Sequence, residues 1–256
     1  MKEYVKGLKT SILEGIVHGY KDYIHVRTKA HRTMEISEAY AYVRSNHIEH
    51  QVAMHIKEYM EFQKSNAGPS WKYLKFSGSG LSNNQPLSFI LKNEKYFNAE
   101  AVTLGKNAFN KKGEKEKEYL RELISKNQNI DFDKLQIEYQ NPHQMDWDDY
   151  LSNPNQNATK QKNEGIFNII TYNIDANTKM INSVKIWTPN PMNNKAIMME
   201  DLSEEVMRII AHEEDYLIEN EEFKEFQTIN DTEVQIVDPE KEFGFVFETE
   251  EIEKTN

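Results

Sequence analysis

Histidines are concentrated in one part of the chain, because six of the eight lie between residues 18 and 55. His47 and His50 are three residues apart, so on a helix they share one face and could supply two ligands to an ion such as zinc. A nearby carboxylate, or His18 from another segment, would complete the ligand set. We favour no metal site, because their spacing matches no recognised motif such as His-Glu-x-x-His, and His47 and His50 are the candidate ligands if a metal ion binds.

The position of His55 indicates a different role. It lies between Val52 and Tyr59 on an apolar helical stripe, where a histidine is typically a hydrogen-bonded core residue. It is also eight residues from His47, which is about 12 Å along a helix axis and too far for the two rings to share one ion.

Other catalytic chemistries have little support in the sequence. There is no cysteine, which excludes disulfides, thiol nucleophiles and zinc sites built on thiolates. The Asp/Glu-x-Lys tripeptide of restriction-type nucleases occurs once, at 222–224, in an acidic segment that would repel nucleic acid. The acidic cluster at 146–149 is typical of the start of a short helix. No phosphate-binding loop or dinucleotide motif occurs, and we predict no cofactor.

Charge is distributed very unevenly along the chain. Residues 196–256 contain 20 acidic and four basic residues, a formal charge of −16, whereas residues 1–195 carry +5. Such a two-signed field suits the binding of a charged macromolecule better than the enclosure of a small apolar substrate.

The acidic region includes a predicted helix from about Asp201 to Phe226. Like charges four residues apart destabilise a helix, so this density of carboxylates is a cost that packing must offset. The charges either keep the protein soluble or form a surface that binds a basic protein partner. The candidate partner-binding residues are Glu204, Glu205, Glu213, Glu214, Asp215, Glu219, Glu221, Glu222 and Glu225.

The first 33 residues have the opposite sign and interleave basic residues with tyrosines. This mixture occurs in nucleic-acid contacts and equally in ordinary basic surface helices. The candidate nucleic-acid contacts are Lys21, Arg27, Lys29 and Arg32.

The elements that must position these residues are helices and antiparallel strand pairs, so the predicted class is α+β, an antiparallel sheet of hairpins packed against several helices. Helices are expected at 34–64, 114–127 and 201–226. Hairpins are expected from 71–76 with 87–91 and from 165–174 with 180–188, and a last strand pair from 234–237 with 243–247.

The Asn/Gln-rich segment 153–165 is the best linker candidate. It would separate a region of helices and a hairpin at 1–152 from a second region at 166–256, which contains a hairpin, the acidic helix and the final strand pair. A single domain containing a long loop remains open. No apolar run approaches the roughly 20 residues of a membrane span, and the start lacks the apolar core of a signal peptide, so we expect a cytoplasmic protein without membrane contact.

Four stretches, Trp71–Phe76, Phe89–Phe97, Thr171–Asp175 and Trp187–Pro191, resemble an uncharacterised protein family of prophages and mobile elements in AT-rich Gram-positive bacteria. The resemblance implies an accessory protein that acts on host or rival machinery, and it brings no catalytic residues.

Three hypotheses about function follow. The leading one is a non-enzymatic interaction or regulatory protein of phage or mobile-element type, whose acidic surface binds a basic protein such as a nucleic-acid enzyme or a defence complex, as a host-defence inhibitor would. The second is a metal-dependent hydrolase or nuclease using histidine and carboxylate ligands. The third is a nucleic-acid-binding regulator acting through the basic amino-terminal segment. A homo-oligomer is compatible with each.

Overall fold

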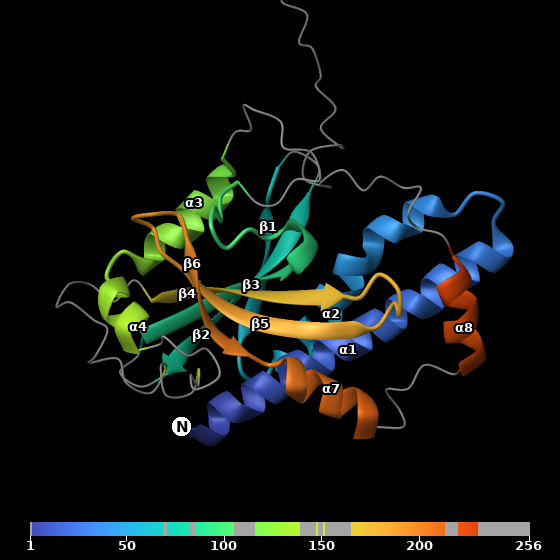
Figure 1. Ribbon diagram of the computed structural model, residues 1–256, viewed down its shortest axis with the longest axis horizontal. Coiled ribbons are helices and arrows are strands. Elements are labelled where there is room, and N and C mark those ends of the chain that lie inside the picture. The colour runs from blue at the N-terminus through green and yellow to red at the C-terminus, as the bar shows by residue number, and fades with distance from the viewer. Residues whose placement is uncertain are drawn as a thin grey trace, which may run out of the picture.

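The computed structural model describes residues 2–68, 71–81, 85–104, 116–138, 147, 151, 165–212 and 220–229. A six-stranded sheet lies at the centre, with helices on both of its faces (Figure 1). The strands are β1 (Glu61–Asn66), β2 (Lys72–Leu81), β3 (Gln85–Asn93), β4 (Ile166–Ile174), β5 (Ile181–Pro189) and β6 (Ala196–Asp201). The α-helices are α1 (Lys2–Thr33), α2 (Arg44–Ile56), α3 (Glu118–Ile124), α4 (Phe132–Glu138), α7 (Ser203–His212) and α8 (Asn220–Thr228). Short 3-10 helices are η1 (Glu38–Val43), η3 (Glu94–Tyr96) and η4 (Ser125–Asn127).

The strands are ordered along the sheet as they are along the chain, and every neighbouring pair is antiparallel except β3 and β4. The predicted α+β class and both predicted hairpins, β2–β3 and β4–β5, are confirmed. The parallel pair was not expected. It joins strands from either side of the Asn/Gln-rich segment, so one sheet is continuous across that segment, whose residues 153–164 themselves lie outside the described ranges.

The sheet separates two apolar layers. On one face, β-strand residues such as Phe76, Phe89 and Ile170 pack with α1 and α2. On the other face, Ile90, Phe167 and Ile169 form a smaller cluster with α3. In Figure 1, α1 runs along one side of the sheet and α3 lies on the other. The core therefore lies mainly between the sheet and the α1–α2 pair.

Two glycines let α1 approach α2 closely. A Cβ atom on Gly15 would lie 2.6 Å from the Val52 Cα, and one on Gly19 would lie 2.4 Å from the Ile48 Cα. Real Cβ contacts are longer than this, so the backbone of α2 occupies the space that side chains would need.

The helix predicted over 34–64 is shorter than expected. The apolar stripe itself is confirmed, because Ile48, Val52 and Ile56 are buried on α2. However, Glu61–Asn66 forms β1 instead of the end of the helix. Pairing of β1 with β2, from Glu61 opposite Ser77 to Asn66 opposite Lys72, overrides a local composition that suits a helix.

The carboxyl-terminal part also differs from expectation. The structure describes two helices, α7 and α8, in place of one helix over 201–226, and they run in different directions in Figure 1. Before them Ala196–Asp201 forms β6, an edge strand that the sequence reading did not include. The predicted final strand pair lies outside the described residues.

A buried asparagine fastens η4 to the sheet. The Asn127 amide nitrogen donates to the carbonyl oxygens of Phe167 at 2.9 Å and Pro189 at 2.8 Å, and its oxygen accepts from the Phe167 N–H at 2.8 Å. Asn127 is fully buried, so water does not compete for these backbone groups.

We expect Asn127→Ala to lower the free energy of unfolding by about 2 kcal/mol, because it leaves buried backbone groups of β4 and β5 without partners. Urea denaturation of both proteins measures the difference. Asn182→Ala is the control, since Asn182 bonds only to the Asn173 side chain at an exposed position. Equal losses in the two variants would contradict this role for Asn127.

Candidate functional site

Five of the nine acidic residues chosen from the sequence lie in the described parts of the chain, on α7 and α8. Glu204 and Glu205 on α7 lie near Arg208, at 3.5 and 3.6 Å. Glu221 on α8 is exposed. The other two described members, Glu222 and Glu225, face α1 and are treated next. The remaining candidates lie outside the described residues: Glu213, Glu214, Asp215 and Glu219.

Helix α8 is bound to α1 by opposite charges. The Arg32 guanidinium donates to both carboxylate oxygens of Glu225, with Nε 2.8 Å from Oε1, and this hydrogen bond lowers the pKa of Glu225. His25 Nδ1 lies 3.0 Å from Glu222 Oε1. Phe226 packs against the Tyr20 and Tyr23 rings of α1. Glu222 and Glu225 therefore contact α1 of the same chain, and Glu225 pairs with the charge of Arg32.

The same packing changes the interpretation of the basic amino-terminal segment. Arg27 is buried and donates to the Ser37 hydroxyl at 2.8 Å, so its selection as a nucleic-acid contact was wrong. Arg32 is engaged by Glu225. Lys21 is half-buried, whereas Lys29 and Arg32 are exposed. The burial of Arg27 follows from the loop after α1, which folds back over its last turns.

The two candidate metal ligands, His47 and His50, are not joined by a third ligand in the described part of the chain. His18 pairs with His55, with 2.7 Å between Nδ1 and Nε2, and His55 Nδ1 lies 3.7 Å from Glu14 Oε2. The interpretation of His55 as a hydrogen-bonded residue is confirmed. Burial lowers the pKa of His47, and His50 is exposed. In the parts of the chain that the structure describes, no three histidine or carboxylate side chains are arranged to hold a metal ion.

A cavity that sequence reasoning missed lies at one end of the sheet. Because β3 and β4 are parallel, their carboxyl ends meet at the same edge, and Asn93 pairs there with Tyr172. Residues from η1 and α2 cover this edge, leaving a cavity of about 90 Å³. It is lined by Ala41, Tyr42, Arg44, Ser45, Glu49, Trp71, Tyr73, Ile90, Leu91, Lys92, Asn93, Tyr96, Tyr119 and Tyr172. Five tyrosines and a serine make its polar lining rich in hydrogen-bond donors.

Two cations line this cavity. Lys92 Nζ donates to the Tyr119 hydroxyl at 3.1 Å. The Arg44 guanidinium lies 5.8 Å from the centre of the Tyr23 ring. Burial lowers the pKa of Arg44, but tyrosines around it, Tyr172 first, raise that pKa above its usual range, so the group stays charged. Among the described residues, no carboxylate lies within ion-pair distance of Arg44.

Glu49 on α2 is the single carboxyl group of the cavity lining. Its Oε2 accepts a hydrogen bond from the backbone N–H of Leu74 at 2.9 Å. Burial raises the pKa of Glu49 to about 8, against an ordinary value of 4.5, so the carboxyl is mostly protonated at neutral pH. Burial likewise raises the pKa of Tyr172 to about 12, which keeps its phenol a hydrogen-bond donor. The lining at pH 7 is therefore cationic and rich in donors.

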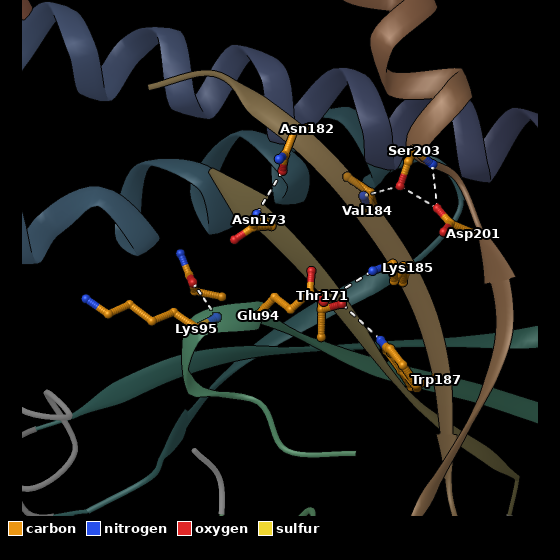
Figure 2. A network of polar contacts seen from close by, with 11 residues as sticks. Glu94, Lys95, Thr171, Asn173, Asn182, Val184, Lys185, Trp187, Asp201 and Ser203 are labelled. Carbon is orange, nitrogen blue, oxygen red and sulfur yellow. Dashed lines mark hydrogen bonds and ion pairs between the residues drawn. The ribbon is translucent and has the colours of Figure 1, made fainter. Parts of the chain in front are cut away.

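The 3-10 helix η3 forms part of the rim and is held in place by polar contacts. The Asn93 side chain accepts from the Lys95 N–H at 2.9 Å. Figure 2 shows Glu94 reaching Lys185 of β5, at 3.2 Å, next to the bond from Trp187 Nε1 to the Thr171 hydroxyl. Because these bonds tie η3 to β3 and β5, the Lys95 and Tyr96 backbone beside the cavity has a defined position.

A wider groove adjoins the cavity. Its volume is about 340 Å³, and Glu49 and Tyr73 line both hollows. The β1–β2 register places Phe62 opposite Phe76 and Lys64 opposite Leu74, so Phe62 and Lys64 lie on the sheet face that α2 covers. The groove is lined by Asn46, Glu49, His50, Ala53, Phe62, Lys64, Lys72, Tyr73 and Leu74. Cavity and groove together are our candidate site.

Comparisons of the chain with models of protein families, with curated proteins and with solved structures each found no match. The resemblance to a prophage or mobile-element family therefore stays a prediction. No described helix combines the length and the apolar character that crossing a bilayer requires.

Proposed function

We propose that this protein binds a small anionic ligand and holds its phosphate or carboxylate group in the cavity beside Arg44. The observation that carries the proposal is the partly buried guanidinium with no acidic partner among the described residues. Withdrawing a charge from water without pairing it costs free energy, and a bound anion would offset that cost.

The chemistry of the lining selects for an anion. A guanidinium presents a planar fork of N–H donors that matches the oxygens of carboxylates and phosphates. Lys92 adds a second positive charge, and the phenol of Tyr172 stays protonated. A cavity of about 90 Å³ has room for one such group together with water.

The state of Glu49 agrees with this proposal. An ionised carboxylate would repel an anion at this short range, whereas a protonated carboxyl can donate a hydrogen bond to it. Burial keeps the Glu49 carboxyl mostly protonated at neutral pH. A polar group that is costly to bury, in a hollow with other polar groups, is typical of a functional site.

The acidic-surface hypothesis stays a prediction, together with the cytoplasmic and mobile-element setting. Fewer of its candidate residues are available than the sequence suggested, because Glu222 and Glu225 contact α1 and four candidates lie outside the described residues. The metal-dependent hydrolase has no ligand set in the described part of the chain. Binding at the cavity is the function that the geometry supports best.

We expect Arg44→Gln to lower the affinity for sulfate and inorganic phosphate at least tenfold, because glutamine keeps polar contacts and loses the charge. Isothermal titration calorimetry at pH 7 and constant ionic strength measures the affinity. Arg208→Gln is the matched control, since Arg208 is an exposed arginine on α7 away from the cavity.

Thermal unfolding without ligand separates binding from folding. Arg44→Gln should be no less stable than the original protein, because it removes an unpaired charge. Failure of the original protein to bind either anion, or equal binding by the Arg44 and Arg208 variants, would refute the proposal.

A further inference from the structure

We infer that the ligand is a nucleoside monophosphate, with its phosphate in the cavity at Arg44 and its base in the adjoining groove against Phe62. The inference rests on the proposed anion site and names the class of ligand that fills both hollows. It depends on the adjacency of the two hollows, on the chemistry of the groove, and on an exposed aromatic ring.

The two hollows suit two parts of one molecule. The cavity accommodates a phosphate-sized group, whereas the groove, at about 340 Å³, has the volume of a pocket for a larger organic group. Glu49 and Tyr73 line both, so the two hollows are neighbours, and a ligand with its anionic group in the cavity would place its remainder toward the groove. An inorganic anion alone would leave the groove unused.

Phe62 supplies a flat apolar surface within the groove. Its side chain is 42% exposed, on β1 at the edge of the described sheet. Nucleic-acid bases stack on such rings regardless of their identity, because every base has a planar face. Phe62 is therefore the expected stacking residue.

The polar lining of the groove favours a base over an alkyl chain. Asn46 and His50, on α2, carry groups that can both donate and accept hydrogen bonds, as the edges of bases require. Lys64 and Lys72 give the groove a positive potential that attracts a nucleotide. A fatty carboxylate would leave these polar groups desolvated without partners.

The test compares ligands that share one part of a nucleotide. Adenosine, guanosine, cytidine and uridine monophosphates, inorganic phosphate and adenosine are titrated into the full chain by calorimetry at pH 7. At least one nucleoside monophosphate should bind tenfold or more tightly than inorganic phosphate, and adenosine should bind more weakly than its monophosphate. Phe62→Ala should reduce nucleotide affinity about tenfold and leave phosphate affinity unchanged.

Met192→Ala is the control, because Met192 is 87% exposed in the β5–β6 connection and lines neither hollow. Phosphate binding that depends on Arg44, with no gain for any nucleotide or no loss in the Phe62 variant, would overturn this inference and leave the proposed function intact. Absence of binding by every phosphate compound would overturn both.

Discussion

Replacing Gly19 with alanine should destabilise the protein by about 3 kcal/mol or more, or prevent folding, because the new Cβ has no room. It would lie 2.4 Å from the Ile48 Cα and 2.7 Å from the His47 carbonyl oxygen, which are backbone atoms of α2. A backbone cannot rotate away as a side chain can, so α1 and α2 must separate. Alanine favours a helix over glycine by only about 1 kcal/mol, which does not compensate.

The separation of α1 from α2 would loosen packing throughout the larger core, because the two helices enclose this core together with the sheet. It would also displace α2, which carries Arg44 and Glu49, so anion binding should weaken in any folded fraction. Circular dichroism during thermal and urea unfolding measures the loss.

Gly7→Ala is the matched control, because it is a glycine-to-alanine change on the same helix. Its Cβ would approach the Tyr59 hydroxyl at 2.6 Å, and that is the end of a side chain that can move. We expect a change near zero at this site. A Gly19 variant as stable as the Gly7 variant would show that the close α1–α2 contact is not required.

The parts of the fold that follow from local pattern were predictable from the sequence. The stripe of Ile48, Val52 and Ile56 has helical spacing, and the strands around the turn at 175–178 alternate polar and apolar residues. Asp175 fixes that turn by accepting from the Thr178 N–H at 2.7 Å. These elements could be predicted because they depend on contacts between residues that are close in the sequence.

The parts that depend on distant partners were not predictable in the same way. Arg32 and Glu225 are 193 residues apart, and each belongs to a run of like charges in the sequence. When the basic residues of the first 33 positions and the acidic residues of 201–226 are considered separately, they suggest two exposed surfaces of opposite sign. In the folded protein Arg32 and Glu225 form an ion pair, because the packing of the Phe226 ring against α1 brings the two side chains into contact.

The candidate site was hidden for a related reason. Its charged residues come from α2 and β3, and Tyr172 joins them from β4, which pairs in parallel with β3 across a connection of more than 70 residues. Arg44, Glu49 and Lys92 match no motif, and each is ordinary in its local context. The fold class could be inferred from pattern, but the cavity required knowledge of strand order.

Glu49→Gln should stabilise the protein increasingly as pH rises from about 4.5 to 8, by on the order of a few kcal/mol at the upper end. Below pH 4.5 the carboxyl is protonated in folded and unfolded chains alike. Above it the unfolded chain releases the proton and the folded chain retains it up to about pH 8. The free energy of unfolding therefore falls by about 1.4 kcal/mol per pH unit in this window. Glutamine has no proton to retain and can still accept from Leu74.

Urea denaturation at pH 5, 6, 7 and 8 measures this difference, and Glu58→Gln at an exposed position is the control. Parallel stability curves for the original protein and Glu49→Gln would contradict the role of burial at Glu49.

The same proton links stability to binding. Sulfate keeps its charge over this range, so its affinity should fall as pH passes 8 in the original protein, where Glu49 ionises in the cavity lining, and should not fall in Glu49→Gln. The carboxyl whose burial lowers stability between about pH 4.5 and 8 would thus also set the upper pH limit of anion binding.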